Sequence, residues 1–389
     1  MRIAQLVTTL TFLPKYYAST EYIICRGLAK RGHEVTLFTT DRQPKWQTLR
    51  KGETKNRIEK YEGFTVHRNN SGPEIGIIPL IPSLFPKLFH MDYDIIHAHD
   101  YCSMSSFYGA VVSKIKRCPF LLTQHNYQLP SKLANELLYL FGTFTMGKFI
   151  FANSRSLIAL NSDISNHLVE MGADEKKIEI IPNAVDTKLF SPEKINFLEE
   201  KWKISHPVIL FVGRLVEDKG VKYLLKAFSD VVRDIPDAKL VIIGEGSEEK
   251  KLKILKSKLG LDNVFFLGAI EHRFLPNIYA GCDVFVLPSI KEPFGIVAIE
   301  AMAAGKVVIG SYVGGIKDTI VHGVTGYHVQ PTNTQQISSY LIRLLTDDHL
   351  RKTLGYNARI RAAKKYDQEN IIDKVELIYQ KLLNHSESL

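Results

Sequence analysis

Short apolar runs alternate with longer amphipathic segments along most of the chain. In the first half, this pattern predicts strands interleaved with helices. Strands are expected at Ile3–Thr8, Glu34–Thr39, Asp94–Ala98, Phe120–Thr123, Lys148–Ala152 and Ile178–Ile181, and helices at Tyr22–Arg31 and Ser154–Met171. Alternation of this kind is typical of a parallel sheet with helices on both faces.

The pattern restarts at Pro207, and a second parallel sheet is therefore predicted. Its strands are expected at Val208–Val212, Lys239–Ile243, Val264–Leu267, Asp283–Leu287 and Val307–Gly310, and helices at Lys222–Asp234, Ile296–Ala304 and Gln368–Leu383. A chain of 389 residues is too long for one ordinary core, which also favours two domains.

The composition, 45% hydrophobic and 23% charged, is that of an ordinary globular protein. Its four cysteines form no CxxC pair, which fits a reducing cytosol. No apolar run reaches membrane-spanning length, and the start of the sequence lacks the features of a signal peptide. The net charge of +9 suits anionic substrates or an anionic membrane surface, and no nucleic-acid-binding motif accompanies it.

Polar residues follow several predicted strands, at the strand ends where parallel sheets bind ligands. His97-Ala98-His99-Asp100 ends one predicted strand, and Gln124-His125 follows another. We expect one of His97 and His99 to face the core, by alternation along the strand. These histidines do not suggest a zinc site, and the absence of a GxGxxG motif after the first strand argues against a nicotinamide or flavin enzyme.

The segment from Gly213 to Gly220 has the residues of a phosphate-binding loop. Arg214 offers a planar fork of donors that suits phosphate oxygens, and Lys219 adds a point charge. The two glycines allow sharp turns and a close backbone approach. The alternative is a surface Arg and Lys that pair with Glu217 and Asp218.

Glu292 and Glu300 bracket a loop and the start of the helix predicted from Ile296. The first N–H groups of that helix, near Gly295, would be available for an anion. Two carboxylates that accept hydrogen bonds from hydroxyls, beside N–H groups that suit phosphate, indicate a nucleotide-sugar pocket. The alternative is a solvated loop glutamate and a glutamate on a helix surface.

The segment Glu292–Gly305 resembles the donor-binding signature of retaining GT-B glycosyltransferases of the family 4 type. The shared features are the two glutamates, Phe294-Gly295 between them, and Glu-Ala-Met-Ala-x-Gly after them. Gly213-Arg214 with Lys219-Gly220 is similar to the family's phosphate-binding pattern, and Thr123-Gln124-His125 is similar to a family tripeptide. The resemblance covers nearly the whole chain and is strongest over residues 178–331.

The resemblance implies a GT-B fold, an α/β architecture of two Rossmann-like parallel-sheet domains that face a central cleft. Residues 1–190 would form the acceptor-side domain and residues 191–367 the nucleotide-sugar-binding domain. The helical segment 368–389 would pack back on the first domain. The expected protein is cytoplasmic and can contact the inner face of the membrane peripherally.

The implied reaction moves a sugar from a nucleoside-diphosphate sugar to a hydroxyl acceptor, such as a lipid-linked or cell-surface glycan precursor. It retains the anomeric configuration and needs neither metal nor cofactor. The catalytic residues would be His125, Arg214, Lys219 and Glu292. The substrate-binding residues would be Phe294, Gly295, Ile296, Glu300, Gly213, His99 and Lys15.

The loop before the first helix departs from the family pattern, because Pro14-Lys15-Tyr16-Tyr17-Ala18 stands where members usually carry a glycine pair. Lys15 could supply a charge in its place. Two other functions remain open from the sequence. One is a nucleotide-sugar epimerase on the same fold, and the other is a non-catalytic nucleotide-sugar-binding protein.

Overall fold

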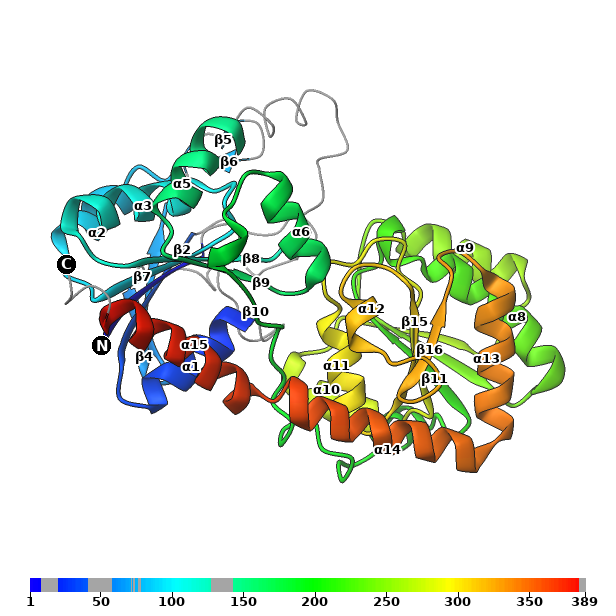
Figure 1. Cartoon of the computed structure of the whole chain (residues 1–389). Helices are drawn as coiled ribbons and strands as arrows, with labels where there is room; N and C mark the ends of the chain where they lie inside the picture. Colours follow the sequence, from blue (N-terminus) through cyan, green and yellow to red (C-terminus); the bar gives the residue numbers. More distant parts are fainter. Residues whose placement is uncertain are drawn as a thin grey trace. The chain divides into compact units, whose positions relative to one another are not determined.

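A computed structural model describes residues 1–7, 20–40, 58–70, 72, 74–75, 78–126 and 143–384. Within these ranges the chain divides into two compact units (Figure 1). The first unit takes the residues up to Pro182 and those from Glu369 onward, and the second takes Asn183–Gln368. The prediction of two parallel α/β sheets is confirmed.

The sheet of the first unit is parallel except for the antiparallel pair of β3 and β4. Its strands, in spatial order, are β10 (Ile178–Ile180), β9 (Ser156–Ala159), β8 (Phe120–Gln124), β7 (Ile95–His99), β1 (Arg2–Leu6), β2 (Glu34–Thr40), β4 (Phe64–Asn69) and β3 (Ile58–Tyr61). The chain first moves outward from β1 to β2 and then returns to the other side at β7. The loops after β1 and β7 therefore leave the sheet in opposite directions, which makes a topological switch point.

Helices cover both faces of this sheet. They are α1 (Thr20–Lys30), α2 (Leu84–His90), α3 (Met104–Lys116), α5 (Lys148–Asn153), α6 (Ser162–Glu170) and α15 (Gln368–Asn384). The unit also contains a short π-helix η1 (Thr143–Gly147), a 3-10 turn η2 (Glu175–Lys177) and a separate hairpin of β5 (Glu74–Ile75) and β6 (Ile78–Pro79). Gly109 of α3 faces Leu6 and Phe120 on one side of the sheet. On the other side, α15 contacts α1, where Ile372 packs against Gly27 (Figure 1).

The predicted strand Lys148–Ala152 and the predicted helix Ser154–Met171 are wrong. Residues 148–153 form helix α5, and the strand is β9, followed by helix α6. A short apolar run such as Phe149–Ala152 fits either a strand or a buried helix, so periodicity alone does not decide. The four residues of β9 are all buried between β8 and β10, whereas α5 has exposed and intermediate positions.

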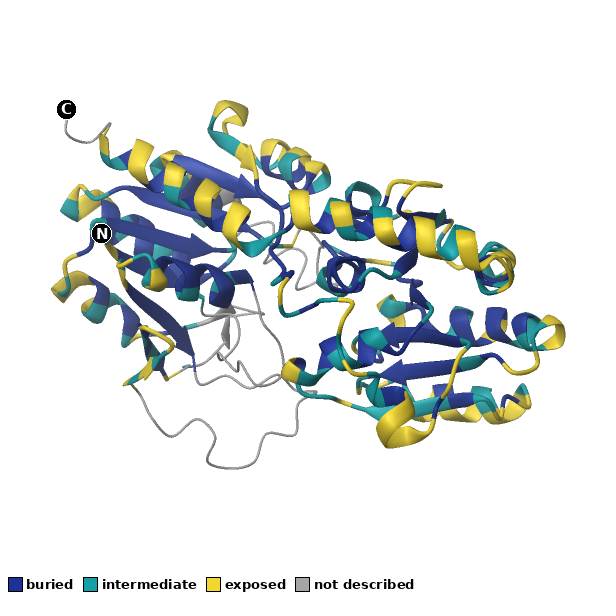
Figure 2. Cartoon of the chain, turned by 90° about the horizontal axis from the view of Figure 1, so that it is seen from below, coloured by how far each residue is buried: buried dark blue, intermediate teal, exposed yellow. Residues whose placement is uncertain are grey.

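The second unit contains a sheet of parallel strands, enclosed by helices whose outer faces are exposed (Figure 2). The spatial order is β13 (Val264–Gly268), β12 (Lys239–Ile243), β11 (Val208–Val212), β14 (Val284–Leu287), β15 (Val307–Ser311) and β16 (Gly326–Val329). Counted from β11, this is the 3-2-1-4-5-6 order of the Rossmann fold, with its switch point between β11 and β14.

The helices of the second unit are α7 (Phe197–Trp202), α8 (Val221–Asp234), α9 (Glu249–Lys258), α10 (Leu275–Ala280), α11 (Ile296–Ala303), α12 (Ile316–Thr319), α13 (Thr334–Thr346) and α14 (Asp348–Lys365), with turns η3 (Glu217–Lys219) and η4 (His272–Phe274). Helix α8 packs beside α13, and α11 packs beside α14. Across the described ranges, no helix is both long enough and apolar enough to cross a membrane.

Candidate functional site

The switch point of the second sheet brings two predicted site segments together. Gly213 and Arg214 follow β11, and the segment with Glu292 follows β14, its hydrogen-bonded neighbour. The carboxyl ends of these strands lie at the same edge of the sheet. The strand order of the second unit thus explains how residues far apart in the sequence become neighbours at a ligand-binding edge.

Gly220 lets the two loops approach each other closely. It adopts a left-handed conformation, with φ of 66°, and a Cβ at this position would lie 2.1 Å from the carbonyl oxygen of Pro288. The backbone N–H of Ile290 donates to the oxygen of Asp218 at 2.7 Å and fixes the same contact. Only glycine fits both requirements, so Gly220 seats turn η3 against the loop after β14.

This contact sets Lys219 against Glu292. Nζ of Lys219 lies 2.5 Å from Oε2 of Glu292, and Oγ of Ser289 donates to the same oxygen at 3.2 Å. The side chains of Lys219 and Glu292 are only 15% and 8% exposed. Glu217 pairs instead with Lys222 at 3.1 Å, so the alternative in which Lys219 pairs with its own loop is not what the structure shows. Arg214, which precedes Lys219 by five residues in the sequence, is exposed.

Helix α11 begins four residues after Glu292. Gly295 occupies its N-cap with φ of 90°, and Ile296 is its first residue, so the first N–H groups of the helix point out of its start. The N–H of Gly315 donates to the oxygen of Pro293 at 3.1 Å and braces the loop. The ring of Phe294 is buried against Tyr366, with centroids 6.1 Å apart, so its side chain packs inside and only its backbone can serve a ligand.

Glu300 lies one turn into α11 and is 3% exposed. Its Oε1 lies 2.8 Å from Nε2 of His272, and the hydroxyl of Tyr279 donates to its Oε2 at 3.0 Å. Burial, followed by the nearby Glu300 charge, raises the pKa of Tyr279 well above its ordinary value, so this hydroxyl keeps its proton. The interpretation of Glu300 as a solvated helix-surface residue is therefore wrong.

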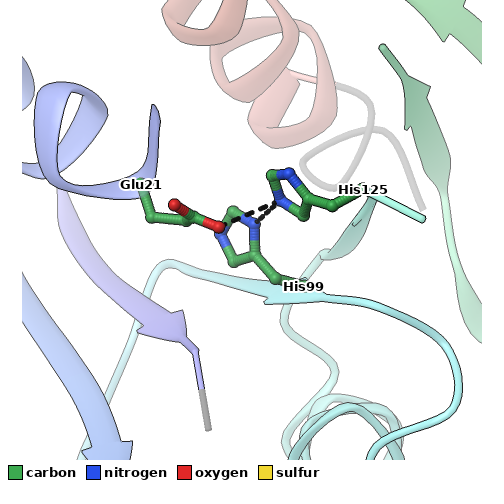
Figure 3. A group of neighbouring side chains, drawn as sticks. All are labelled: Glu21, His99 and His125. Atoms are coloured by element: carbon green, nitrogen blue, oxygen red, sulfur yellow. Dashed lines mark hydrogen bonds and ion pairs between the residues drawn. The ribbon is translucent and has the colours of Figure 1, made fainter. Parts of the chain in front are cut away.

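The first unit has its own cluster, at the carboxyl ends of β7 and β8 (Figure 3). Nε2 of His125 lies 2.8 Å from Nδ1 of His99 and 3.3 Å from a carboxylate oxygen of Glu21, on α1. Asp100, with φ of 63°, accepts a hydrogen bond from the backbone N–H of His125 at 3.0 Å. Helix α1, strand β7 and the residue that follows β7 thus hold His125 in place at the switch point of the first sheet.

His97 and His99 do not divide between the two sides of the sheet, and that prediction is wrong. Residues two apart on a strand point to the same face, and both rings are buried and stacked with centroids 4.5 Å apart. Burial, with the charge of His125 adding to it, lowers the pKa of His99 to about 3. Burial likewise lowers the pKa of His97 well below its ordinary value, so both rings are neutral near pH 7.

Glu21, His99 and His125 bring three potential metal ligands within 4.8 Å of one another. Zinc binds histidine nitrogen at about 2.0 to 2.1 Å, so two such ligands in a tetrahedral site lie about 3.3 Å apart. The 2.8 Å between the two imidazole nitrogens is shorter than that and is an ordinary hydrogen-bond distance. The cluster therefore fits a hydrogen-bonded group better than a metal centre.

Lys15 lies outside the described residues. Four residues that were not predicted from the sequence contact predicted site residues: Glu21, Ser289, His272 and Tyr279. Ser289 lies in the Pro288–Glu292 loop, so its proximity to Glu292 could have been inferred from sequence. The contacts of the other three depend on tertiary packing and leave no local pattern.

Comparisons with known proteins agree with this architecture. A family model for Glycosyltransferase Family 4 matches residues 22–189, and one for Glycosyl transferases group 1 matches residues 194–361. The chain is 34% identical, over 92% of both sequences, to the uncharacterized glycosyltransferase MJ1607 of Methanocaldococcus jannaschii. It is 31% identical to the capsular polysaccharide biosynthesis glycosyltransferase CapM of Staphylococcus aureus, over 64% of this chain and 67% of CapM.

Among solved structures, HepE of Anabaena in complex with UDP superposes with a TM-score of 0.80 at 23% identity, covering 98% of this chain and 100% of HepE. Two Rossmann-like sheets, each with polar residues at its switch point, define a GT-B glycosyltransferase when taken with these matches. The chain belongs to the glycosyl transferases group 1, the family 4 type.

Proposed function

We propose that this enzyme transfers a sugar from a nucleoside-diphosphate sugar to a hydroxyl acceptor with retention of configuration and without an essential metal. The observation that carries the proposal is the pair of Lys219 and Glu292 at the switch point of the second sheet, beside the start of α11. A cation, a carboxylate and a helix N-terminus at one edge match the diphosphate and the hydroxyls of a nucleotide sugar.

The leaving group is a nucleoside diphosphate, on which negative charge develops during transfer. Arg214 and Lys219 would stabilise that charge, because fixed cations aimed at a developing charge lower the barrier. Glu292 would hold sugar hydroxyls, while Phe294, Gly295 and Ile296 would offer backbone N–H groups. Gly213 would allow the phosphates to approach the backbone closely.

Glu300 would bind the ribose. Its oxygens already accept from His272 and Tyr279, but a carboxylate has about four lone-pair sites and can accept further hydrogen bonds. In the first unit, His125 would contact the reacting groups, and His99 would support it. The matched HepE structure holds UDP, which favours a UDP-sugar as donor. CapM acts in capsular polysaccharide biosynthesis, which favours a lipid-linked or cell-surface glycan precursor as acceptor.

The proposal is tested by thermal unfolding of the purified protein with a panel of UDP-, GDP-, ADP- and dTDP-sugars, with and without EDTA. We expect one donor to raise the melting temperature, and this shift to survive EDTA. The Lys219→Met variant should lose most of the shift, whereas Lys222→Met, which removes a partly exposed neighbouring lysine that pairs with Glu217, should keep it. No shift with any donor, or a shift that EDTA abolishes, would contradict the proposal.

Turnover supplies the second test. With the stabilising donor and lipid-linked or free saccharide acceptors, NMR of the product should show the anomeric configuration of the donor. Lys219→Met and Glu292→Gln should each lower kcat by about a hundredfold or more, as expected for groups that stabilise the transition state. An inverted product would exclude the retaining mechanism.

A further inference from the structure

A continuous chain of hydrogen bonds leads away from His125, on the face of the first sheet that α15 covers. In order, it joins Glu21, His125, His99, Gln5, Tyr379, His97 and Thr123. The register of β1, β7 and β8 explains why the links meet, since Gln5 lies beside His97 and His99 lies beside Thr123. The polar side chains of three adjacent strands and Tyr379 of α15 therefore form one connected chain, which runs from β8 to β1 and returns to β8.

Each pair of neighbouring polar atoms in the chain lies at hydrogen-bond distance, so one atom of each pair must carry the proton that joins them. Nε2 of His99 lies 2.9 Å from Oε1 of Gln5, and Nε2 of Gln5 donates to the Tyr379 hydroxyl at 2.8 Å. That hydroxyl lies 2.7 Å from Nδ1 of His97, whose Nε2 lies 2.7 Å from Oγ1 of Thr123. Neutral imidazole carries one N–H and one lone pair, so each ring donates on one side and accepts on the other.

This alternation makes the whole chain directional. When the Gln5 amide donates to Tyr379, the tyrosine proton goes to Nδ1 of His97, and His97 donates from Nε2 to Thr123. On the other side, the Gln5 oxygen accepts from Nε2–H of His99, so Nδ1 of His99 accepts from Nε2–H of His125. Turning the Gln5 amide over reverses every proton and gives a second arrangement that is equally complete between Thr123 and His125.

Glu21 decides between the two arrangements. Its carboxylate oxygen lies 3.3 Å from Nε2 of His125. In the first arrangement that nitrogen carries a proton and attracts the carboxylate. In the reversed arrangement it presents a lone pair to a negative oxygen, which is repulsive. Figure 3 shows Nε2 of His125 turned toward both Glu21 and His99, with the second ring nitrogen directed away from them.

We propose that Glu21 is a positioning residue that sets the direction of this chain and holds neutral His125 as its Nε2–H tautomer, leaving the lone pair on Nδ1. Because the links are coupled, Glu21 also sets the tautomer of His97, from which it is separated by His125, His99, Gln5 and Tyr379. This inference rests on the proposed function only for its consequence, which is that His125 meets the reacting groups with an acceptor nitrogen.

The test is the tautomer of each histidine, read from the ¹⁵N chemical shifts of histidine-labelled protein, with signals assigned through His97→Gln and His125→Gln. In the wild type, we expect neutral His125, His99 and His97 to carry their protons on Nε2. In Glu21→Gln, an amide can donate to Nε2 of His125, so the reversed tautomer should become populated at His125 and also at His97.

The Tyr379→Phe substitution breaks the chain between Gln5 and His97. It therefore distinguishes an effect transmitted along the chain from a direct effect of Glu21 on His125. In the double variant Glu21→Gln with Tyr379→Phe, His125 should still respond while His97 no longer follows it. Glu62→Gln is the matched control, because Glu62 accepts from Tyr22 in the same unit and lies outside the chain. It should leave all three tautomers unchanged. A protonated Nδ1 on neutral wild-type His125, or a His97 that ignores Glu21→Gln, would overturn the proposal.

Kinetics distinguish a failure of this inference from a failure of the proposed function. Glu21→Gln should lower kcat about tenfold, in line with the loss of a correctly oriented proton acceptor. Its stabilisation by the donor should equal that of the wild type, because the residues proposed above to bind the diphosphate, the sugar hydroxyls and the ribose belong to the second unit. Changed tautomers with an unchanged kcat would uphold the directional chain and remove His125 from the proposed catalytic set.

Discussion

Nζ of Lys219 lies 2.5 Å from Oε2 of Glu292, and the pair joins the loops that follow β11 and β14. Both side chains are more than four-fifths buried, so the attraction between the two charges has to compensate for the hydration that each loses. A diphosphate that binds Lys219 would take over one partner, and sugar hydroxyls would take over the second. The ion pair thus holds both side chains in place at the edge where we propose that the donor binds.

The stability of this pair is testable by a double-mutant cycle. Lys219→Met leaves Glu292 as a buried carboxylate without its cation and should lower the free energy of unfolding by about 3 kcal/mol. Glu292→Gln should cost a similar amount for the reverse reason. The double variant should recover most of the loss in urea unfolding, because no unpaired charge remains. Strictly additive losses would show that the two side chains do not interact.

Gly220 offers a test of how the loops are seated. An alanine at this position would have to adopt a left-handed φ of 66°, and its Cβ would lie 2.1 Å from the Pro288 oxygen. Gly220→Ala should therefore lower the free energy of unfolding by about 3 kcal/mol and abolish the donor-induced shift.

Gly260 is the matched control for this variant, because its φ is 64° and nothing lies within 4 Å of the position that a Cβ would occupy. Gly260→Ala should cost only the backbone strain, about 1 kcal/mol, and should leave donor binding intact. Equal losses for the two variants would show that the contact with Pro288 contributes nothing.

Variants of Glu300 and Tyr279 can distinguish a role of Glu300 in ribose binding from a role in packing. Glu300→Gln should weaken binding of the stabilising nucleotide about tenfold, measured by calorimetry, because ribose hydroxyls lose a charged acceptor. Tyr279→Phe removes a donor to Glu300 but leaves the carboxylate in place. It should lower stability by about 1 to 2 kcal/mol and change nucleotide affinity less than twofold. The opposite ranking would place the ribose elsewhere.

The buried histidines predict a loss of stability in mild acid. Burial first, and then the charge of His125, lowers the pKa of His99 to about 3, whereas an unfolded histidine titrates near about 6.5. Between these values the unfolded chain binds a proton that the folded chain does not, so stability is constant above about pH 6.5 and falls as the pH drops below it. His97 adds to the same effect, since burial also lowers its pKa well below the ordinary value.

Each of these histidines contributes at most about 1.4 kcal/mol per pH unit. In urea unfolding between pH 7 and pH 5, the His99→Gln variant should lose stability less steeply than the wild type. His349→Gln is the control, because His349 is exposed and should leave the slope unchanged. A wild-type stability that does not fall with the pH would mean that His97 and His99 titrate normally.

The sequence was sufficient for the elements that repeat a simple pattern. Strand β11 was predicted to the residue, and α11, with its loop and glutamates, could be placed because Pro293, Gly295 and Gly305 mark turns. The right-handedness of parallel connections limits the possible strand orders but does not select one, so the order in the sheets came from the structure. This order is what brings the predicted donor-binding residues of the second unit to one edge.

Other features depended on contacts that no local pattern encodes. The segment after Lys148 was mistaken for a strand because its helix buries the same apolar residues that a strand would. The partners of Glu300 come from η4 and α10, and Gln5 meets Tyr379 across 374 residues of sequence. The sequence next to such a residue carries no motif, and the residue joins the site only because distant helices and strands pack against one another.

The assignment of α15 to the first unit has a consequence for biosynthesis. The ribosome completes residues 183–368 before it makes Glu369 and the buried face of α15, which includes Ile371, Val375 and Tyr379. During translation the second unit can therefore reach its native state first, while one face of the first unit's sheet is covered by α1 and still lacks α15. Chaperone binding is expected to concentrate on this early segment, and to end when α15 emerges from the exit tunnel.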